Sequence, residues 1–198
     1  MQTGLNKSYW QSRYTTAQTG WDVGAATPPL AAYITQLENK DAEILIPGCG
    51  LAWEADVFLE NGFSNLTLID VTEEPLQAAR NRFSAKSFPE PLAIVGDFFS
   101  LEVTFDLVLE QTFFCALQPQ LRKAYVDKMW QILKPGGKLV GLIFTVEFPF
   151  EGPPFGTLPQ EFEKLFAEKF ELLTFSPAYN SISPRQENEH FLIARKLG

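Results

Sequence analysis

The chain has 198 residues, of which 45% are hydrophobic and 20% are charged, and its formal net charge is -8. This length suits one domain with a substantial core, and the composition argues against disorder over most of the chain. An acidic chain has no general attraction to nucleic acid or to anionic membranes, so we expect a small-molecule substrate and neither of those partners. The oligomeric state is left open.

The N-terminal residues contain no continuous apolar stretch, which argues against a signal peptide. The longest strongly apolar run, Leu139 to Phe144, is far too short to span a membrane. Two cysteines, Cys49 and Cys115, indicate no disulfide framework. We therefore expect a reduced, cytoplasmic setting.

The first half of the chain begins with a helix over 6–14 and a Thr- and Gly-rich loop over 15–26. Thr27-Pro28-Pro29 is typical of a helix start, and this helix is expected to continue through 30–37. Short apolar runs then predict strands at 43–47, 66–70 and 92–95. Helices are expected between them at 52–61, closed by Gly62, and after Thr72, which can cap the helix that follows.

The second half continues the alternation with a strand at 105–109 and a helix at 119–133. In that helix the apolar residues Leu121, Tyr125, Met129 and Ile132 recur at helical spacing, and 135–137 (Pro-Gly-Gly) is expected to break it. A strand at 138–146, a helix at 159–170 and late strands at 171–175 and 190–196 complete the chain. Strands alternating with helices predict an α/β fold with a doubly wound, mostly parallel seven-stranded sheet.

Ligands bind such sheets outside the carboxyl ends of the strands, and there the chain places Gly48 and Gly50, then Asp70, then Asp97 with Phe98. The glycines allow a tight turn and a close ligand, and Asp70 can accept hydrogen bonds from ribose hydroxyls. Asp97 can reach an adenine amino group, and Phe98 can pack beside the base. Two glycines alone are equally typical of an ordinary strand-to-helix turn, but the two acids in register favour a nucleotide site.

The ligand of this site is expected to lack phosphates. A dinucleotide fingerprint needs a third small residue where this chain has Trp53, and no phosphate-gripping Gly-Lys-Ser/Thr follows the loop. A nicotinamide enzyme is therefore disfavoured, and an adenosyl ligand is favoured.

The order of Gly-Cys-Gly, Asp70, Asp97 and Pro-Gly-Gly resembles class I S-adenosylmethionine-dependent methyltransferases. More specific stretches are similar to the thiopurine S-methyltransferase family, and within it most similar to the halide/thiol methyltransferase branch: 10–14 (WQSRY), 19–28 (TGWDVGAATP), 46–50 (IPGCG), 105–116 (FDLVLEQTFFCA) and 152–155 (GPPF). The resemblance implies the class I fold as one domain over 1–198, with an N-terminal helical cap and cofactor lid at 1–38 and an α/β core at 39–198.

The resemblance also implies S-adenosyl-L-methionine as cofactor and no metal. It assigns cofactor positions to Trp10, Tyr14, Trp21, Gly48, Gly50, Asp70, Asp97, Phe98 and Gln111. Gln111 stands where relatives carry Arg or Tyr, which leaves its contact undefined. Trp21, Phe114, Cys115, Phe155 and Tyr179 are assigned to a substrate pocket, with Tyr179 as a possible orienting residue.

Methyl transfer from a sulfonium is an in-line displacement that needs alignment and exclusion of water but no protein nucleophile. We therefore expect a thiol, bisulfide or halide acceptor. Two alternatives stay open: an O- or N-methyltransferase, whose base would come from Tyr179, His190 or Glu110, and a non-catalytic cofactor-binding protein. Four local alternatives stay open too: a packing role for Tyr179, a structural role for buried Cys115, a surface or strand-end role for His190, and a plain turn at 152–155.

Overall fold

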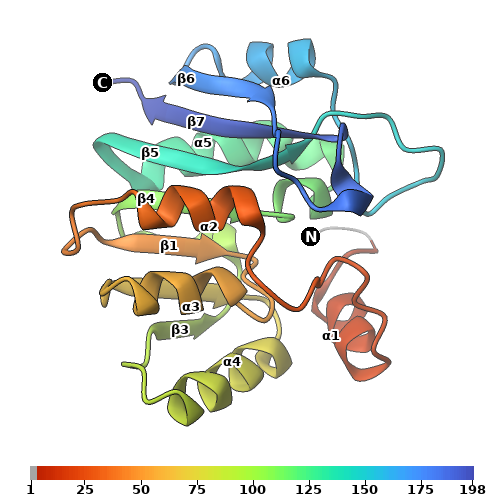
Figure 1. Cartoon of the computed structure of the whole chain (residues 1–198). Coiled ribbons are helices and arrows are strands. Elements are labelled where there is room, and N and C mark those ends of the chain that lie inside the picture. The colour runs from red at the N-terminus through yellow and green to blue at the C-terminus, as the bar shows by residue number, and fades with distance from the viewer. Residues whose placement is uncertain (1–3) are drawn as a thin grey trace. The chain divides into compact units, whose positions relative to one another are not determined.

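A computed structural model describes residues 4–198. The chain divides into two compact units, Met1–Ser100 and Leu101–Gly198. Figure 1 shows both with their helices and strands labelled. No helix among residues 4–198 is long and apolar enough to cross a membrane.

The first unit is built on three parallel strands in the order β3-β2-β1. They are β1 (Ile44–Pro47), β2 (Leu66–Asp70) and β3 (Leu92–Val95). Parallel neighbours need crossover connections, which α3 (Trp53–Glu60) and α4 (Glu73–Ala85) supply. All four residues of β1 are buried, as expected for an inner strand of such a sheet.

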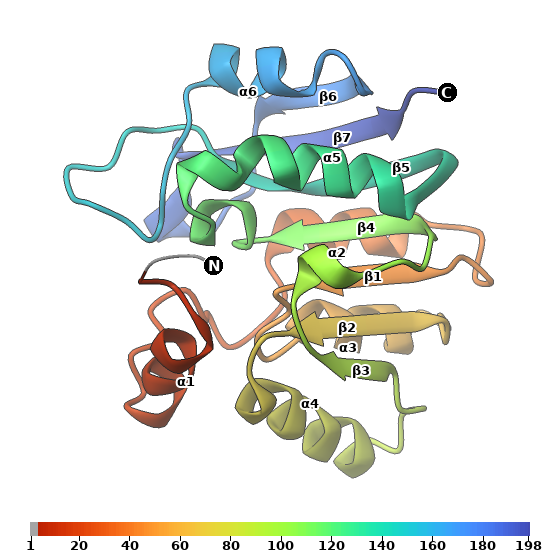
Figure 2. The ribbon, with the colours of Figure 1, turned by 180° about the vertical axis from the view of Figure 1, so that it is seen from behind.

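Helices α1 (Lys7–Thr15) and α2 (Pro28–Thr35) precede this sheet. The helix α2 packs on α3, and both lie on one face of β1 and β2, in front in Figure 1 and behind in Figure 2. The side chain of Asn6 caps α1 by accepting a hydrogen bond from the amide of Tyr9 at 3.0 Å. In both views α1 lies at the carboxyl ends of β1 and β2, and it contacts α4.

The second unit contains the strand order β4-β5-β7-β6. Its strands are β4 (Phe105–Gln111), β5 (Leu133–Phe144), β6 (Phe170–Pro177) and β7 (Glu189–Lys196). The pair β4–β5 is parallel, and β7 runs antiparallel to both β5 and β6. Helices α5 (Arg122–Ile132) and α6 (Pro159–Phe166) pack on each other and on this sheet.

Short 3-10 turns complete the chain: η1 (Phe98–Ser100), η2 (Phe114–Ala116), η3 (Pro119–Leu121) and η4 (Ser183–Arg185). The seven strands and their alternation with helices confirm the α/β class expected from the sequence. The division into one cap and one core within a single domain stays a prediction.

The Pro-Gly-Gly segment does not end the preceding helix, and this prediction was wrong. The helix α5 already ends at Ile132, and Leu133 pairs with Phe105 at the start of β5. The register between β4 and β5 then shifts, because Pro135, Gly136 and Gly137 lie within β5 as an irregularity. Tertiary pairing of Leu133 therefore decides the helix boundary before the proline is reached.

The helix expected at 159–170 is also shorter, because α6 ends at Phe166 and Phe170 begins β6 opposite Lys196. The carbonyl of Lys169 accepts the amide of Leu197, which joins this corner to the end of β7. Strand pairing again overrides a helical pattern.

Candidate cofactor and substrate sites

The glycine loop after β1 turns the chain back into α3. Gly48 and Gly50 adopt φ values of 54° and 51°, in the left-handed region that favours glycine. The amide of Cys49 donates to the carbonyl of Ile69 at 3.1 Å, which ties this loop to the end of β2. The tight turn expected from the sequence is therefore present beside the strand that carries Asp70.

Asp70 is the centre of a hydrogen-bonded cluster at the end of β2, and its residue is 7% exposed. One carboxylate oxygen accepts the amide of Gly50 at 3.1 Å. The other accepts the amide and the hydroxyl of Thr72 at 2.9 and 2.8 Å. Burial raises the pKa of Asp70, and the donors from Thr72 and Gly50 oppose that rise.

Thr72 occupies the N-cap position of α4, as expected, but its side chain does not cap the helix. Its hydroxyl donates to Asp70 instead. This is a charge-assisted hydrogen bond, and in this orientation the hydroxyl oxygen accepts no hydrogen bond from the first-turn amides of α4.

Three aromatic residues of the N-terminal segment form one cluster. The ring of Trp21 makes edge contacts with Trp10 and Tyr14, at centroid distances of 5.5 and 5.8 Å. The hydroxyl of Tyr14 lies 3.2 Å from where a β-carbon on Gly50 would stand. Burial, and next the negative charge of Asp70, raise the pKa of Tyr14 above its ordinary value. Tyr14 of the expected lid therefore lies against the glycine loop, and Trp21 packs on Tyr14.

Asp97 and Phe98 follow β3. The amide of Gly96 donates to the carbonyl of Asp70 at 2.9 Å, which brings this segment beside the end of β2. Asp97 is exposed, and its carboxylate accepts the amide of Phe99 at 2.9 Å. Phe98 is 4% exposed and its ring packs against that of Phe99. Their assigned contacts with an adenine ring stay predictions.

Glu110, near the end of β4, is fully buried and holds the segment that follows it. Its two carboxylate oxygens accept the amides of Phe113 and Phe114, each at 2.9 Å, and the second oxygen also accepts the hydroxyl of Tyr125 at 2.8 Å. Burial raises the pKa of Glu110 to about 7. The sequence suggested Glu110 only as a possible base, and no sequence signal indicates this structural role.

Among the substrate-pocket residues assigned to the second unit, Cys115 and Phe155 are in contact and Phe114 is buried. The carbonyl of Cys115 accepts the amide of Phe155 at 2.7 Å, so the η2 turn and the 152–155 segment are joined. Phe114 is 2% exposed and packs on Tyr125 and Phe162. Burial raises the pKa of Cys115, so its sulfur stays a protonated thiol at neutral pH. Gln111, the last residue of β4, is half-buried.

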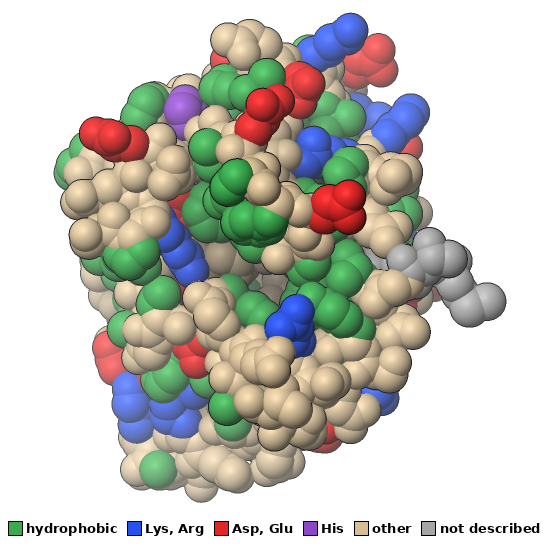
Figure 3. Space-filling model, turned by 90° about the vertical axis from the view of Figure 1, so that its right-hand side faces the viewer, with side chains coloured by type: hydrophobic (Ala, Val, Ile, Leu, Met, Phe, Trp, Pro, Cys, Tyr) green, Lys and Arg blue, Asp and Glu red, His purple; other side chains and the backbone are tan. Residues whose placement is uncertain are grey.

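Tyr179 is 90% exposed, which rules out a packing role for its ring. Figure 3 shows hydrophobic side chains reaching the surface in several patches on one face of the molecule, and Phe150 and Tyr179 are among the exposed large side chains of the second unit. The role of Tyr179 in orienting a substrate stays a prediction.

His190 is half-buried in β7, and its Nδ1 lies 2.6 Å from the hydroxyl of Thr145. Burial lowers the pKa of His190. This contact satisfies one ring nitrogen near the start of β7, in keeping with the strand-end alternative for this residue.

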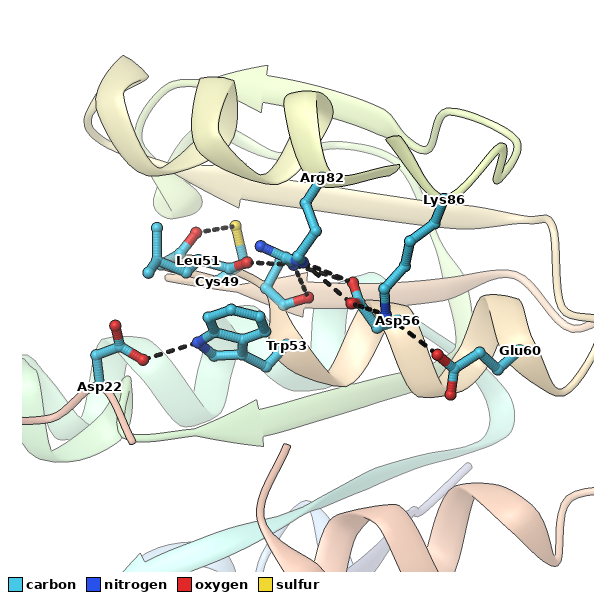
Figure 4. A network of polar contacts seen from close by, with 10 residues as sticks. Asp22, Cys49, Leu51, Trp53, Asp56, Glu60, Arg82 and Lys86 are labelled. Atoms are coloured by element: carbon cyan, nitrogen blue, oxygen red, sulfur yellow. Dashed lines mark hydrogen bonds and ion pairs between the residues drawn. The ribbon is translucent and has the colours of Figure 1, made fainter. Parts of the chain in front are cut away.

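Sequence reasoning missed a polar network beside the glycine loop, drawn in Figure 4. Trp53 donates from its indole nitrogen to Asp22 at 2.7 Å, and Arg82 bonds to the carbonyls of Leu51 and Ala52 at 2.7 and 3.1 Å. No spacing rule connects residues 22, 53 and 82, because α3 and α4 bring them together only in the folded unit.

The residues at this loop fit an adenosine cofactor that lacks phosphates. Asp70 is an acceptor at a strand end, and Gly48 and Gly50 carry no β-carbon in the turn. Arg82, a cation beside the loop, donates to the main-chain carbonyls of Leu51 and Ala52 and to the carboxylate of Asp56, so its donors are engaged within the protein. Among residues 4–198, no group of three or more His, Cys, Asp or Glu side chains can hold a metal ion.

Comparison with known proteins identifies the family. The sequence profile of the thiopurine S-methyltransferase family matches residues 5–195. A probable thiol methyltransferase 2 of Arabidopsis thaliana is 28% identical over 184 residues, which cover 91% of this chain and 81% of that protein. A thiopurine S-methyltransferase of Photobacterium profundum is 25% identical over 207 residues, covering 94% and 95%.

Solved structures show the same fold. The 1,6-didemethyltoxoflavin-N1-methyltransferase of Burkholderia thailandensis, solved with S-adenosylhomocysteine, superposes with a TM-score of 0.77 at 18% identity, covering 98% of this chain and 88% of that one. The magnesium protoporphyrin IX methyltransferase of Synechocystis superposes with a TM-score of 0.73 at 12% identity, covering 96% and 97%. The chain therefore belongs to the thiopurine S-methyltransferase family and is an S-adenosylmethionine-dependent methyltransferase with the class I α/β fold.

Proposed function

We propose that the chain transfers the methyl group of S-adenosylmethionine to a small soft nucleophile, namely a thiol, bisulfide or a halide, by in-line displacement. The observation that carries this proposal is the joining of Asp70 to Gly50 beneath the aromatic cluster of Trp10, Tyr14 and Trp21. The names of the relatives, which are thiol, thiocyanate and thiopurine methyltransferases, support a sulfur acceptor.

In this proposal Asp70 accepts hydrogen bonds from the ribose hydroxyls of the cofactor. Gly48 and Gly50 carry no side chain, so the cofactor can approach the main chain of the loop. Asp97 faces the adenine amino group, and Phe98 supports the base from below. When bound, the cofactor supplies an electrophilic methyl group on a sulfonium. A ring face of Trp10 or Trp21 attracts such a cation by about 0.5–2 kcal/mol.

The remaining work of the protein is alignment and exclusion of water. The aromatic cluster closes one side of the cofactor, and Phe114, Cys115 and Phe155 contribute apolar walls for the acceptor. Gln111 is close to Phe114 and Cys115 in the sequence, and Tyr179 orients the acceptor. A halide is already an anion and a thiol reacts as its thiolate, so no strong protein base is required.

An O- or N-methyltransferase would need such a base. Glu110 is unsuited to that role because it is fully buried and already accepts three hydrogen bonds. One nitrogen of the His190 ring is occupied by Thr145. These contacts favour the soft nucleophile over a hydroxyl or an amine.

A cytoplasmic setting is part of the proposal, because both cysteines are free thiols in the structure. The partner is a small molecule, and the proposal needs neither nucleic acid nor a membrane.

A radiolabelled methyl-transfer screen tests the proposal. Purified protein is incubated with labelled S-adenosylmethionine and iodide, bisulfide, thiocyanate, small thiols or aromatic thiols, with phenols and amines as the contrasting panel. We expect product only from the soft nucleophiles. Transfer confined to phenols or amines would overturn the assigned acceptor class, and tight binding of S-adenosylhomocysteine without any turnover would reveal a non-catalytic binding protein.

A further inference from the structure

A hydrogen bond joins the N-terminal cap to the residue that directly follows the glycine loop. The indole Nε1 of Trp53 donates to the carboxylate of Asp22 at 2.7 Å (Figure 4). Asp22 lies in the segment 16–27 that connects α1 to α2, whereas Trp53 is the first residue of α3 and directly follows the loop. The same oxygen of Asp22 accepts the amide of Gly24 at 2.9 Å, so the carboxylate also shapes its own turn.

Arg82 lies over the face of the Trp53 ring. The guanidinium carbon stands 4.1 Å from the centre of the indole, a favourable cation–π distance. The Nε of Arg82 donates to both carboxylate oxygens of Asp56 at 3.0 Å, and Lys86 donates to the same carboxylate at 2.8 Å. The guanidinium is therefore fixed, and it fixes the plane of the indole.

Arg82 also holds the end of the glycine loop. It donates to the carbonyl of Ala52, a residue with φ of 53°. A residue with a β-carbon in this left-handed region carries about 1 kcal/mol of strain or more. The hydrogen bonds from Arg82 hold this conformation, and the conformation aims Trp53 at Asp22.

Asp22 is the neighbour of Trp21 in the chain, and Trp21 packs on Tyr14 above Gly50. Anchoring Asp22 therefore limits the movement of the aromatic cluster that the proposed function places over the cofactor. The anchor therefore adds a tie at the segment 16–27 to the contact that Tyr14 makes with the loop.

We propose that Trp53 is a positioning residue for methyl transfer: clamped between Arg82 and Asp22, it holds the N-terminal cap closed on the cofactor loop. This inference rests on the proposed function for its catalytic meaning. The hydrogen bond between Trp53 and Asp22 belongs to the first unit, so its effect can also be measured in the protein without cofactor.

The test compares Trp53→Phe, which removes the donor but keeps a ring under Arg82, with Asp22→Ala and with the double variant. Asp22→Asn is the conservative rescue, because an amide oxygen still accepts from Trp53 and Gly24. Trp130→Phe is the matched control, since Trp130 also donates from its indole, to the carbonyl of Leu197 at 3.0 Å, and also carries a cation, Lys196, over its ring.

Two measurements are made on each full-length variant: hydrogen exchange of residues 16–27 without cofactor, and binding of S-adenosylhomocysteine by calorimetry. We expect faster exchange in this segment for Trp53→Phe and Asp22→Ala, and up to about tenfold weaker binding, the size expected of one lost hydrogen bond. The double variant should be no weaker than the worse single variant, and Asp22→Asn and Trp130→Phe should stay close to the parent protein.

Unchanged exchange over 16–27 in Trp53→Phe would overturn the inference, as would losses in the double variant that add up fully, because additive losses mean that the two residues act separately. A parent protein that does not bind S-adenosylhomocysteine would refute the proposed function instead. In that case the exchange measurement would still show whether Trp53 and Asp22 hold the segment 16–27, so the two failures are distinguishable.

Discussion

The carboxylate of Asp70 accepts the amide of Gly50, twenty residues earlier in the chain, at 3.1 Å. The residue proposed to hold ribose thus also holds the glycine loop that is proposed to lie against the cofactor. Both functions meet at the end of β2, because β1 and β2 are parallel neighbours and their carboxyl ends lie at the same edge.

Replacing Asp70 by alanine should therefore weaken cofactor binding by roughly 1.5–3 kcal/mol, since charge-assisted hydrogen bonds are lost. Calorimetry with S-adenosylhomocysteine measures this change, and circular dichroism verifies that the variant is folded. Cofactor affinity equal to that of the parent protein would contradict the assignment of Asp70 to ribose.

Gly141 on β5 stands opposite Glu110 on β4. A β-carbon at position 141 would meet the Glu110 β-carbon at 2.5 Å and its carbonyl oxygen at 2.6 Å. We expect Gly141→Ala to lower the free energy of unfolding by about 1–3 kcal/mol or more, because a central strand pair must separate. Urea denaturation measures it against Gly20→Ala, where nothing lies within 4 Å. Equal stability of the two variants would show that β4 and β5 adjust freely.

Glu110 should make stability depend on pH. Its folded pKa of about 7 lies above the unfolded value, so the folded state binds more protons between these two values. The contribution is fully present below about pH 4.5 and is lost as pH rises to about 7, by up to about 3 kcal/mol.

The measurement is the unfolding free energy of the parent protein and of Glu110→Gln from pH 5 to 8. The parent should lose stability relative to the variant up to about pH 7 and then run parallel to it. A constant difference across this range would mean that Glu110 does not titrate there.

Arg185 and Glu189 form a buried pair, 6% and 2% exposed, in which Glu189 also accepts the hydroxyl of Ser181 at 2.8 Å. Glu189→Leu should destabilise the protein by about 3–5 kcal/mol, because it leaves a buried guanidinium without its carboxylate. Adding Arg185→Met should restore much of that loss. Thermal unfolding of the two variants provides the comparison, and a double variant less stable than Glu189→Leu would refute this account.

Tyr179→Phe separates a binding role from a structural one. Because the ring is 90% exposed, the free energy of unfolding should change by less than about 0.5 kcal/mol. If its hydroxyl orients the acceptor, KM for the acceptor should rise about three- to tenfold, the value of one hydrogen bond. An unchanged KM and kcat across the thiol panel would remove Tyr179 from the substrate site.

Local patterns predicted some strands very well. The strands β2 and β3 have the bounds expected from their apolar runs, and Pro91 and Gly96 flank the run of β3. The carboxyl-end rule for α/β sheets then placed Gly48, Gly50 and Asp70 together, which the structure confirms. The family resemblance on 10–14 and 19–28 was likewise readable from residue order alone.

Contacts between residues far apart in the chain could not be predicted from the sequence. Pro135 was expected to end a helix that strand pairing at Leu133 had already ended, and the hydroxyl of Thr72 turned from its helix to Asp70. The role of Glu110 depends on amides and a hydroxyl that fold back on it, and the Trp53–Asp22 bond joins residues 31 positions apart.

The amino-acid order by itself therefore determined the α/β class, the methyltransferase family and the strand ends at which the cofactor site is proposed. Hydrophobic periodicity and turn residues act over a few positions, and they are written in the local sequence. Only the tertiary structure decided which donors a buried carboxylate receives, where helix gives way to strand, and what fastens the cap. Such hydrogen bonds form between groups whose proximity is created by packing of the helices and strands, and no local spacing encodes it.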